Sequence, residues 1–200
     1  MNAGHTSERV YDALKERLLS GDIHPGDRLE PAFYADALGS SATPVRDALH
    51  RLVGEHLVDM RLAEGFFLPL VTEPGLRSLY MWNLEILRIA LRQWTRGALL
   101  QSPARAAQAD GETARDVFAR IAVLSGNSEI FRSIAAANDR LATARVAESR
   151  TLPPSHLDLS ALRMAIDQAD IKSTARHVIG YHRSCVSYIP QIVQTIYNRL

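Results

Sequence analysis

Basic and hydroxyl side chains gather on and around one short predicted helix, where they could bind the phosphates and base edges of a nucleic acid. Apolar residues from Val45 to Leu52 recur at helical spacing, which predicts one buried face and leaves Arg46 on another. Arginine is the side chain most often used to bind guanine specifically. The candidate DNA contacts are Arg46, Thr43, Ser41, Arg51, His50 and Arg28. A short capped helix with a basic side, after another short helix and a tight turn, predicts a helix-turn-helix.

Some of these residues also have purely structural interpretations. Ser41 and Thr43 precede or begin the helix, where hydroxyl side chains commonly cap free backbone N–H groups. Arg46 could pair with Asp47 or Glu55 instead of reaching a nucleic acid.

Enzymatic chemistry has less support. Cys185 lies three residues after His182, close to one turn away on a helix, and such a pair could act as nucleophile and base. A small buried thiol on a packed helix is the favoured interpretation. The chain has no glycine-rich phosphate loop, no Gly-x-Ser-x-Gly and no His-x-x-x-His. We therefore predict no catalytic residue and no cofactor, and an enzyme is the disfavoured class.

Composition indicates a globular protein of the cytoplasm. Hydrophobic residues make up 46% of the 200 residues, which argues against disorder. The single cysteine cannot form an internal disulfide, which suits a reducing compartment. Neither a signal peptide nor a membrane span is expected, because the most apolar stretch, residues 79–91, is short and contains Glu85 and Arg88.

The net charge of +1 conceals an asymmetry between the two parts of the chain. Residues 1–72 carry a net charge of −4 and residues 73–200 carry +5. The acidic part contains the predicted recognition helix, which is the opposite of what phosphate binding favours.

The predicted fold is mostly α, with an N-terminal winged helix-turn-helix and a C-terminal all-helical bundle. Helices are expected over about 6–20, 31–38 and 43–54, followed by a β-hairpin at 57–70. These elements predict a first domain over residues 1–72. Helices over about 73–101, 102–124, 127–134, 138–148, 155–167 and 171–197, the third beginning with Asn127 or Ser128 as its cap, predict a second over 73–200.

Three segments of the first domain resemble the GntR family of bacterial transcription regulators. They are residues 19–29, Ser41-x-Thr43-Pro44-Val45-Arg46-Asp47-Ala48-Leu49-x-Arg51-Leu52, and Gly65-Phe66-Phe67. The resemblance implies a winged-helix domain that works as a homodimer on a palindromic DNA operator, with Arg46 reaching the duplex.

The order of the later helices is similar to the FCD-type, FadR-like subgroup of that family. Residues 128–134, 138–141 and 169–182 carry the local similarity. The resemblance implies that this domain dimerises and binds a small organic effector.

Several family positions hold atypical residues in this chain. Ala42 replaces the arginine expected after the serine, and Ala32 replaces the arginine of the preceding helix. Glu64 stands where a basic residue usually precedes the wing glycine. An arginine–guanine pair contributes about 1–3 kcal/mol of discrimination, so these replacements are expected to weaken DNA binding.

The metal ligands of the subgroup are also replaced. Ser128, Arg132 and Ser160 occupy three of the four ligand positions, and only His182 is kept, so we expect no metal. At such a position Arg132 would project into the pocket and bind an anionic effector in a fork. Its alternative is an ion pair with Asp167, Glu129 or Glu85. The candidate effector residues are Arg132, His182, Asn83, Ser128, Ser160 and Tyr181.

Two functions follow from the sequence. The leading one is a DNA-binding transcription regulator controlled by a small, possibly anionic, effector. The other is a GntR-fold protein that has lost DNA reading and acts through its helical pocket as a small-molecule binding protein or an enzyme.

Overall fold

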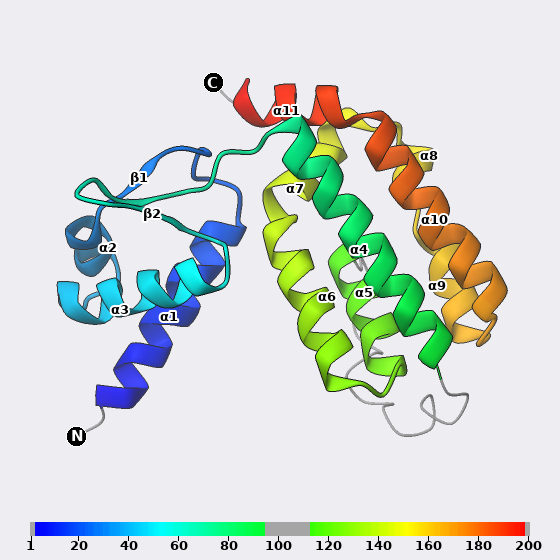
Figure 1. The fold of residues 1–200 in the computed structure, drawn as a ribbon, viewed down its shortest axis with the longest axis horizontal. Helices are drawn as coiled ribbons and strands as arrows, with labels where there is room; N and C mark the ends of the chain where they lie inside the picture. Colours follow the sequence, from blue (N-terminus) through cyan, green and yellow to red (C-terminus); the bar gives the residue numbers. More distant parts are fainter. Residues whose placement is uncertain (1–2, 95–112, 199–200) are drawn as a thin grey trace.

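The computed structural model describes residues 3–94 and 113–198, which form two lobes joined by residues 68–72 (Figure 1). The N-terminal lobe contains α1 (Ala3–Leu19), β1 (Arg28–Leu29), α2 (Pro31–Ala37), α3 (Ala42–Gly54), β2 (Asp59–Arg61) and β3 (Gly65–Phe67). The strands form an antiparallel sheet in the order β1-β3-β2. This lobe is the predicted winged helix-turn-helix.

The C-terminal lobe is helical throughout its described residues. Its elements are α4 (Glu73–Gln93), α5 (Ala114–Leu124), α6 (Ser128–Arg140), α7 (Ala142–Thr151), α8 (Pro154–Leu157), α9 (Ser160–Asp167), α10 (Ile171–Ser187) and α11 (Ile189–Tyr197). The long helices α4, α6 and α10 run side by side in Figure 1, and α11 lies across one end of the bundle. The predicted fold class is thereby confirmed.

Each lobe buries its own hydrophobic core. In the N-terminal lobe Leu14, Leu49 and Leu52 are inaccessible to solvent and join α1 to α3. In the core of the C-terminal lobe, Phe118 and Ile134 are likewise inaccessible to solvent. These residues recur at helical spacing, and that spacing is why the helices could be predicted from the sequence.

The wing differs from the prediction in one respect. The hairpin β2–β3 is present, and Gly65 at its turn has a φ of 106°, a conformation that glycine adopts readily. The connector after α1 was expected to be only a turn, but its residues Arg28 and Leu29 form a third strand against β3. Two residues are too few to show the alternation that identifies a strand.

Helix boundaries in the C-terminal lobe depend on local chemistry. The predicted cap Asn127 is confirmed, because its side chain accepts hydrogen bonds from the N–H groups of Glu129 and Ile130. The single helix expected over 171–197 is wrong, since it divides at Tyr188 into α10 and α11. Pro190 lies in the first turn of α11, where its missing N–H costs no hydrogen bond.

Two further boundaries differ from the prediction. The segment 155–167 forms the separate helices α8 and α9, and Asp158 between them accepts a hydrogen bond from the N–H of Ser160 at 2.8 Å. The helix expected from Asn138 begins later, because Asn138 belongs to α6 and the break falls at Leu141. The helix start expected at residues 102–103 and the end of the first long helix, expected near residue 101, lie outside the described residues.

Among residues 3–94 and 113–198, no helix has both the length and the apolar character needed to cross a membrane.

Two leucines at contrasting positions test the N-terminal core. Leu49 on α3 is fully buried, whereas Leu62 at the wing tip is 93% exposed. We expect Leu49→Ala to lower the free energy of unfolding by about 2–5 kcal/mol, because it leaves a cavity. The matched control Leu62→Ala should change it by less than about 0.5 kcal/mol. Urea unfolding followed by circular dichroism measures both, and equal effects would contradict this packing.

Candidate nucleic-acid interface and effector site

Helix α3 presents Arg46 to solvent. Val45, Ala48, Leu49 and Leu52 form its buried stripe, and Arg46 lies on the exposed side with no ion pair to another described residue. The suggested partner Glu55 is instead bound by Lys15 at 2.7 Å and by the Tyr11 hydroxyl at 2.6 Å. Arg46 therefore does not form the ion pair with Glu55 that the sequence allowed.

The hydroxyl residues at the start of α3 do not cap it through their side chains. Ser41 occupies the N-cap position with extended backbone, but its hydroxyl makes no capping hydrogen bond. Ser41 and Thr43 are both exposed. The prediction of side-chain capping by Ser41 is wrong, and its hydroxyl remains able to donate to a phosphate.

Arg51 lies beside α1, although half of its side chain is exposed. Its guanidinium carbon lies 3.6 Å from the ring centroid of Tyr11, and its Nη1 donates to Glu8 at 2.9 Å. Its Nε is also 3.8 Å from Glu55. Arg51 was predicted to contact DNA, but these contacts use its charge to hold α3 against α1.

His50 and Arg28 both lie close to the wing. The exposed His50 ring meets Phe66 edge to face, with ring centroids 5.0 Å apart. Arg28 pairs with Glu30 at 3.0 Å and lies beside Gly65. A carboxylate thus offsets the charge of Arg28, although the side chain remains exposed.

In the C-terminal lobe, three of the predicted effector residues come together in the core. Asn83 of α4 and Tyr181 and His182 of α10 are all buried. The His182 Nδ1 lies 2.8 Å from the carbonyl oxygen of Val178, and its Nε2 lies 2.9 Å from the Asn83 amide. Burial lowers the pKa of His182 from 6.5 to about 4, so the ring is neutral at pH 7.

The neutral ring determines the direction of both hydrogen bonds. Its Nδ1–H donates to the Val178 carbonyl, and Nε2 must therefore accept. The NH2 of Asn83 is then the group that faces Nε2, because amide nitrogen and oxygen have the same shape and are assigned from their partners. The remaining polar atom of the Asn83 amide has no partner among the described residues.

A buried carboxylate in the same region was missed from the sequence. Glu148 of α7 is only 2% exposed and accepts hydrogen bonds from the hydroxyls of Tyr80 and Tyr181. Burial, followed by the charge of Glu148, raises the pKa of both phenols well above 10, so both remain protonated donors.

Arg145, one turn before Glu148, was also missed. Its Nη2 donates to the side-chain oxygen of Asn138 at 2.9 Å, and its guanidinium lies over the Phe118 ring at 5.0 Å. Its Nε and Nη1 are buried with no hydrogen-bond partner in the described part of the chain. A guanidinium with two free buried donors is suited to an anion or another strong acceptor.

The other predicted effector residues lie on the surface. Arg132 and Ser128 on α6 are exposed, and Arg132 pairs with Glu129 instead of entering the pocket. The buried stripe of α6 runs through Ile130 and Ile134, two residues away from each, and two residues correspond to about 200° around a helix. Ser160 is likewise exposed, at the start of α9.

The Cys–His pair is not assembled for catalysis. Cys185 is fully buried, and burial followed by the charge of Glu148 raises the pKa of its thiol, so it remains neutral. Both ring nitrogens of His182 already have other partners, Val178 and Asn83. Within residues 3–94 and 113–198, no three His, Cys, Asp or Glu side chains lie close enough together to hold a metal ion.

A pocket of about 340 Å³ opens between α8, α9 and α10. His156, Arg176, His177 and Tyr181 contribute to its lining. Tyr181 therefore touches this pocket and also donates to the buried Glu148. It connects the surface with the buried polar cluster, which consists of Tyr80, Asn83, Glu148, Tyr181, His182 and the half-buried Arg145.

The N-terminal lobe, with α3 following α2 and a wing from β2 and β3, defines a winged helix-turn-helix protein. Residues 6–68 match the family model described as "Bacterial regulatory proteins, gntR family". Residues 6–68 are therefore similar to the winged helix-turn-helix domain of this family.

Individual proteins are similar to this chain in sequence and in fold. The HTH-type transcriptional regulator McbR of Escherichia coli is 36% identical over 85 residues, which are 42% of this chain but only 38% of that relative. The solved structure of E. coli McbR/YncC has a TM-score of 0.66 at 22% identity, covering 93% of this chain and 97% of that one. A transcriptional regulator GntR from a Rhodococcus species gives 0.69 at 18% identity, covering 92% and 97%. These structures share the fold of both lobes.

The burial of His182 predicts a pH-dependent stability. Between pH 6.5 and pH 4 the unfolded chain binds a proton at this ring and the folded protein does not, so the free energy of unfolding falls as the pH falls through this window. The loss is about 3 kcal/mol, because one pKa unit corresponds to about 1.4 kcal/mol. Urea unfolding at several pH values measures it. His182→Gln should show a shallower pH dependence, and an unchanged dependence would contradict the assignment.

Proposed function

We propose that this protein is a GntR-type transcription regulator that binds an operator through α3 and a small anionic effector in the helical lobe. The observation that carries the proposal is the GntR-family domain with Arg46 exposed and unpaired on its recognition helix. Residues 1–72 would bind DNA, and residues 73–200 would dimerise and sense the effector, as in the FCD-type subgroup. The protein would act in the cytoplasm, where bacterial DNA lies.

The geometry of binding follows from the winged helix-turn-helix. Helix α3 would enter the major groove, where Arg46 would meet a base edge or a phosphate. Ser41 and Thr43, at the N-terminal end of α3, would contact the sugar-phosphate backbone of the DNA. A homodimer would place two such helices on a palindromic site. The exposed His50, close to the wing, would add a contact beside the groove.

The weakness of the DNA-binding surface supports a second function. Arg28 and Arg51 are paired with carboxylates, and Arg61 of the wing lies 3.9 Å from Glu64. Together with Ala32 and Ala42, these pairs leave little free positive charge around α3. The alternative is therefore a GntR-fold protein that no longer reads DNA and binds a small molecule through its helical lobe.

The effector site is best supported around Arg145. Its two unpartnered donors suit a carboxylate or phosphate oxygen, and the free oxygen of the Asn83 amide could accept a hydrogen bond from a hydroxyl or amino group of the same effector. The aromatic rings of Phe118 and Tyr181 supply apolar walls, as small-molecule sites commonly have. The effector would enter from the pocket beside α10, which shares Tyr181 with the cluster.

Substitution of Arg46 tests DNA reading. Duplexes selected from a random pool by the wild-type protein are measured by fluorescence anisotropy at fixed salt. We expect Arg46→Ala to weaken binding by about 5- to 100-fold, the equivalent of one lost base contact. Arg132→Ala removes another exposed arginine, from the helical lobe, and should have no effect. Failure to select any sequence at low salt would reject DNA reading and favour the second function.

Substitution of Arg145 tests the effector site. A panel of small mono- and dicarboxylic acids, including succinate, citrate and benzoate, is screened by thermal shift on the wild-type protein. We expect Arg145→Met, which keeps most of the side-chain volume, to lose at least about tenfold in affinity for any acid that binds, the value of one charge-assisted hydrogen bond. Arg132→Met should bind it normally. If Arg145→Met binds the acid as tightly as the wild type, Arg145 is not the anchor.

A further inference from the structure

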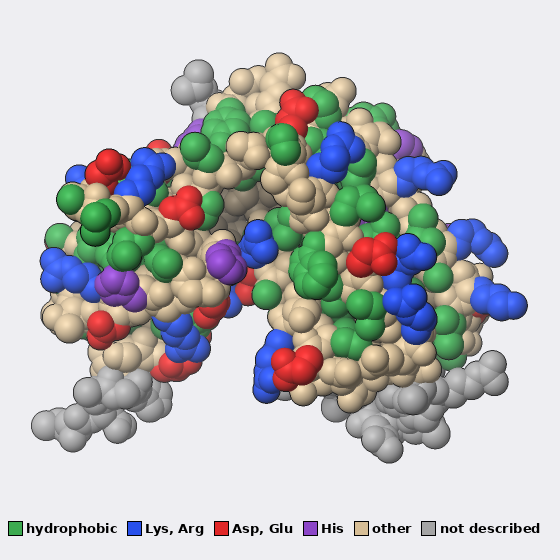
Figure 2. Space-filling view, viewed as in Figure 1, with side chains coloured by type: hydrophobic (Ala, Val, Ile, Leu, Met, Phe, Trp, Pro, Cys, Tyr) green, Lys and Arg blue, Asp and Glu red, His purple; other side chains and the backbone are tan. Residues whose placement is uncertain are grey.

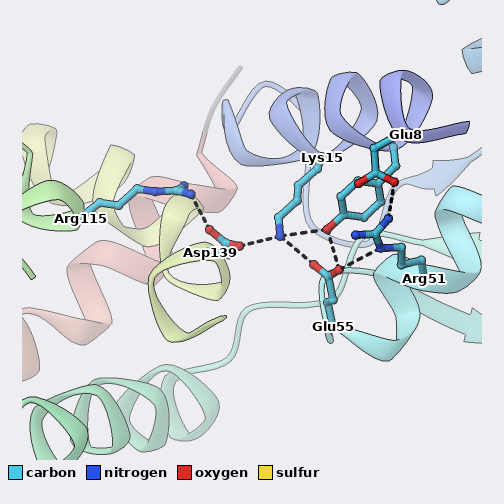
Figure 3. Close-up of polar contacts among 7 residues, drawn as sticks. Glu8, Lys15, Arg51, Glu55, Arg115 and Asp139 are labelled. Atoms are coloured by element: carbon cyan, nitrogen blue, oxygen red, sulfur yellow. Dashed lines mark hydrogen bonds and ion pairs between the residues drawn. The ribbon is translucent and has the colours of Figure 1, made fainter. Parts of the chain in front are cut away.

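The two lobes are connected by a chain of ion pairs centred on one buried carboxylate (Figure 3). Asp139 of α6 is 8% exposed, and its two oxygens bind different cations. Oδ2 lies 2.8 Å from Lys15 of α1, in the N-terminal lobe, and Oδ1 lies 2.7 Å from Arg115 of α5, in the C-terminal lobe. Asp139 is therefore a bridge between the winged helix and the bundle.

Lys15 is also held firmly within its own lobe. Its Nζ is 2.7 Å from Glu55 and donates to the Tyr11 hydroxyl at 3.2 Å. Burial opposes its charge, but hydrogen bonds to Asp139 and Glu55 outweigh this and raise the pKa of Lys15, so the side chain remains charged. Because Glu55 follows directly after α3, movement of Lys15 is transmitted to the recognition helix.

On the other side, the bridge is joined to the buried polar cluster. Asn138 precedes Asp139 on α6, and its side-chain oxygen accepts the hydrogen bond from Arg145. Its amide nitrogen donates to the backbone oxygen of Arg115 at 3.2 Å. Adjacent residues of one helix thus hold the candidate effector anchor and the ion pair that crosses to the winged helix.

The rest of the boundary between the lobes is packed less tightly. The surface is hollowed there in Figure 2, and a cavity of about 180 Å³ lies between residues of both lobes, including Leu57, Leu76 and Asp139. The connecting segment is tied at Val71, whose backbone N–H and oxygen both bond to the Tyr197 hydroxyl. One tied segment leaves rotation about it possible, and the ion pair opposes that rotation.

We propose that Asp139 is the positioning residue that sets the orientation of the winged helix, and that ligand binding at Arg145 acts on it through Asn138. An acceptor that binds Arg145 competes with Asn138 for the guanidinium. Release of Asn138 loosens its hold on Arg115 and the turn of α6 that carries Asp139. The inference rests on the proposed effector site, and the coupling must be reciprocal: DNA that selects one orientation changes affinity for the ligand.

The test measures the distance between the lobes in the full chain. Spin labels at Glu64→Cys on the wing and Gln168→Cys after α9 report the distance by pulsed electron resonance, and the buried Cys185 is not labelled. We expect a narrow distribution in the parent protein. Lys15→Met and Asp139→Asn should each broaden it at least twofold, and the double variant should broaden it no further. Glu8→Gln removes an ion pair of Arg51 within the N-terminal lobe and does not touch Lys15, so its distribution should match the parent.

Each outcome has a definite meaning. A parent-like distribution in either Lys15→Met or Asp139→Asn overturns the bridge, provided that circular dichroism shows both variants folded. Arg145→Met should broaden the distribution as Asp139→Asn does, and a parent-like result overturns the link from the cluster. These measurements need neither DNA nor effector, so they are independent of whether the proposed function holds.

Discussion

A carboxylate excluded from water must be surrounded by donors, and Glu148 imposes this condition on the helical lobe. Tyr80 from α4 and Tyr181 from α10 supply the donors, so three helices are held at fixed positions around one charge. Removing either phenol would leave a buried charge short of a donor, which is far more costly than losing a surface hydrogen bond. The same convergence brings His182, Asn83 and Arg145 together. The polar cluster is consequently both a structural requirement of the bundle and its best candidate for ligand recognition.

Several basic side chains of the N-terminal lobe form ion pairs with carboxylates of the same lobe. Arg51 and Lys15 connect α1 to α3 through Glu8 and Glu55, and Arg28 is offset by Glu30. This explains how a domain with a net charge of −4 can keep a winged-helix architecture and still expose one unpaired arginine on its recognition helix. It also means that long-range attraction to DNA is weak, so binding would depend on direct contacts from Arg46 and its neighbours.

The sequence was sufficient for the fold but only partly for the sites. Apolar spacing identified the main helices, and the motif around Pro44 identified the winged helix. Arg132 was placed wrongly because the rotation of α6 is set by Ile130 and Ile134, which bury the opposite face. Arg145 and Glu148 were missed because a charged pair one turn apart normally indicates a solvated surface. Glu148 is buried because α7 packs against α11 and because phenols from α4 and α10 reach its carboxylate, and Arg145 beside it is half-buried. No local pattern contains that information.

The bridge at Asp139 also restricts how such a protein could be reassembled during evolution. The winged helix and the helical lobe each bury a hydrophobic core of their own, so genes encoding such lobes could recombine without disrupting either core. In this protein an ion pair between Asp139 on α6 and Lys15 on α1 joins the two lobes. A hybrid that inherits only one of the two would keep an unpaired charge at the boundary and a winged helix free to turn. Compatibility between exchanged parts would therefore be decided by this ion pair more than by either core.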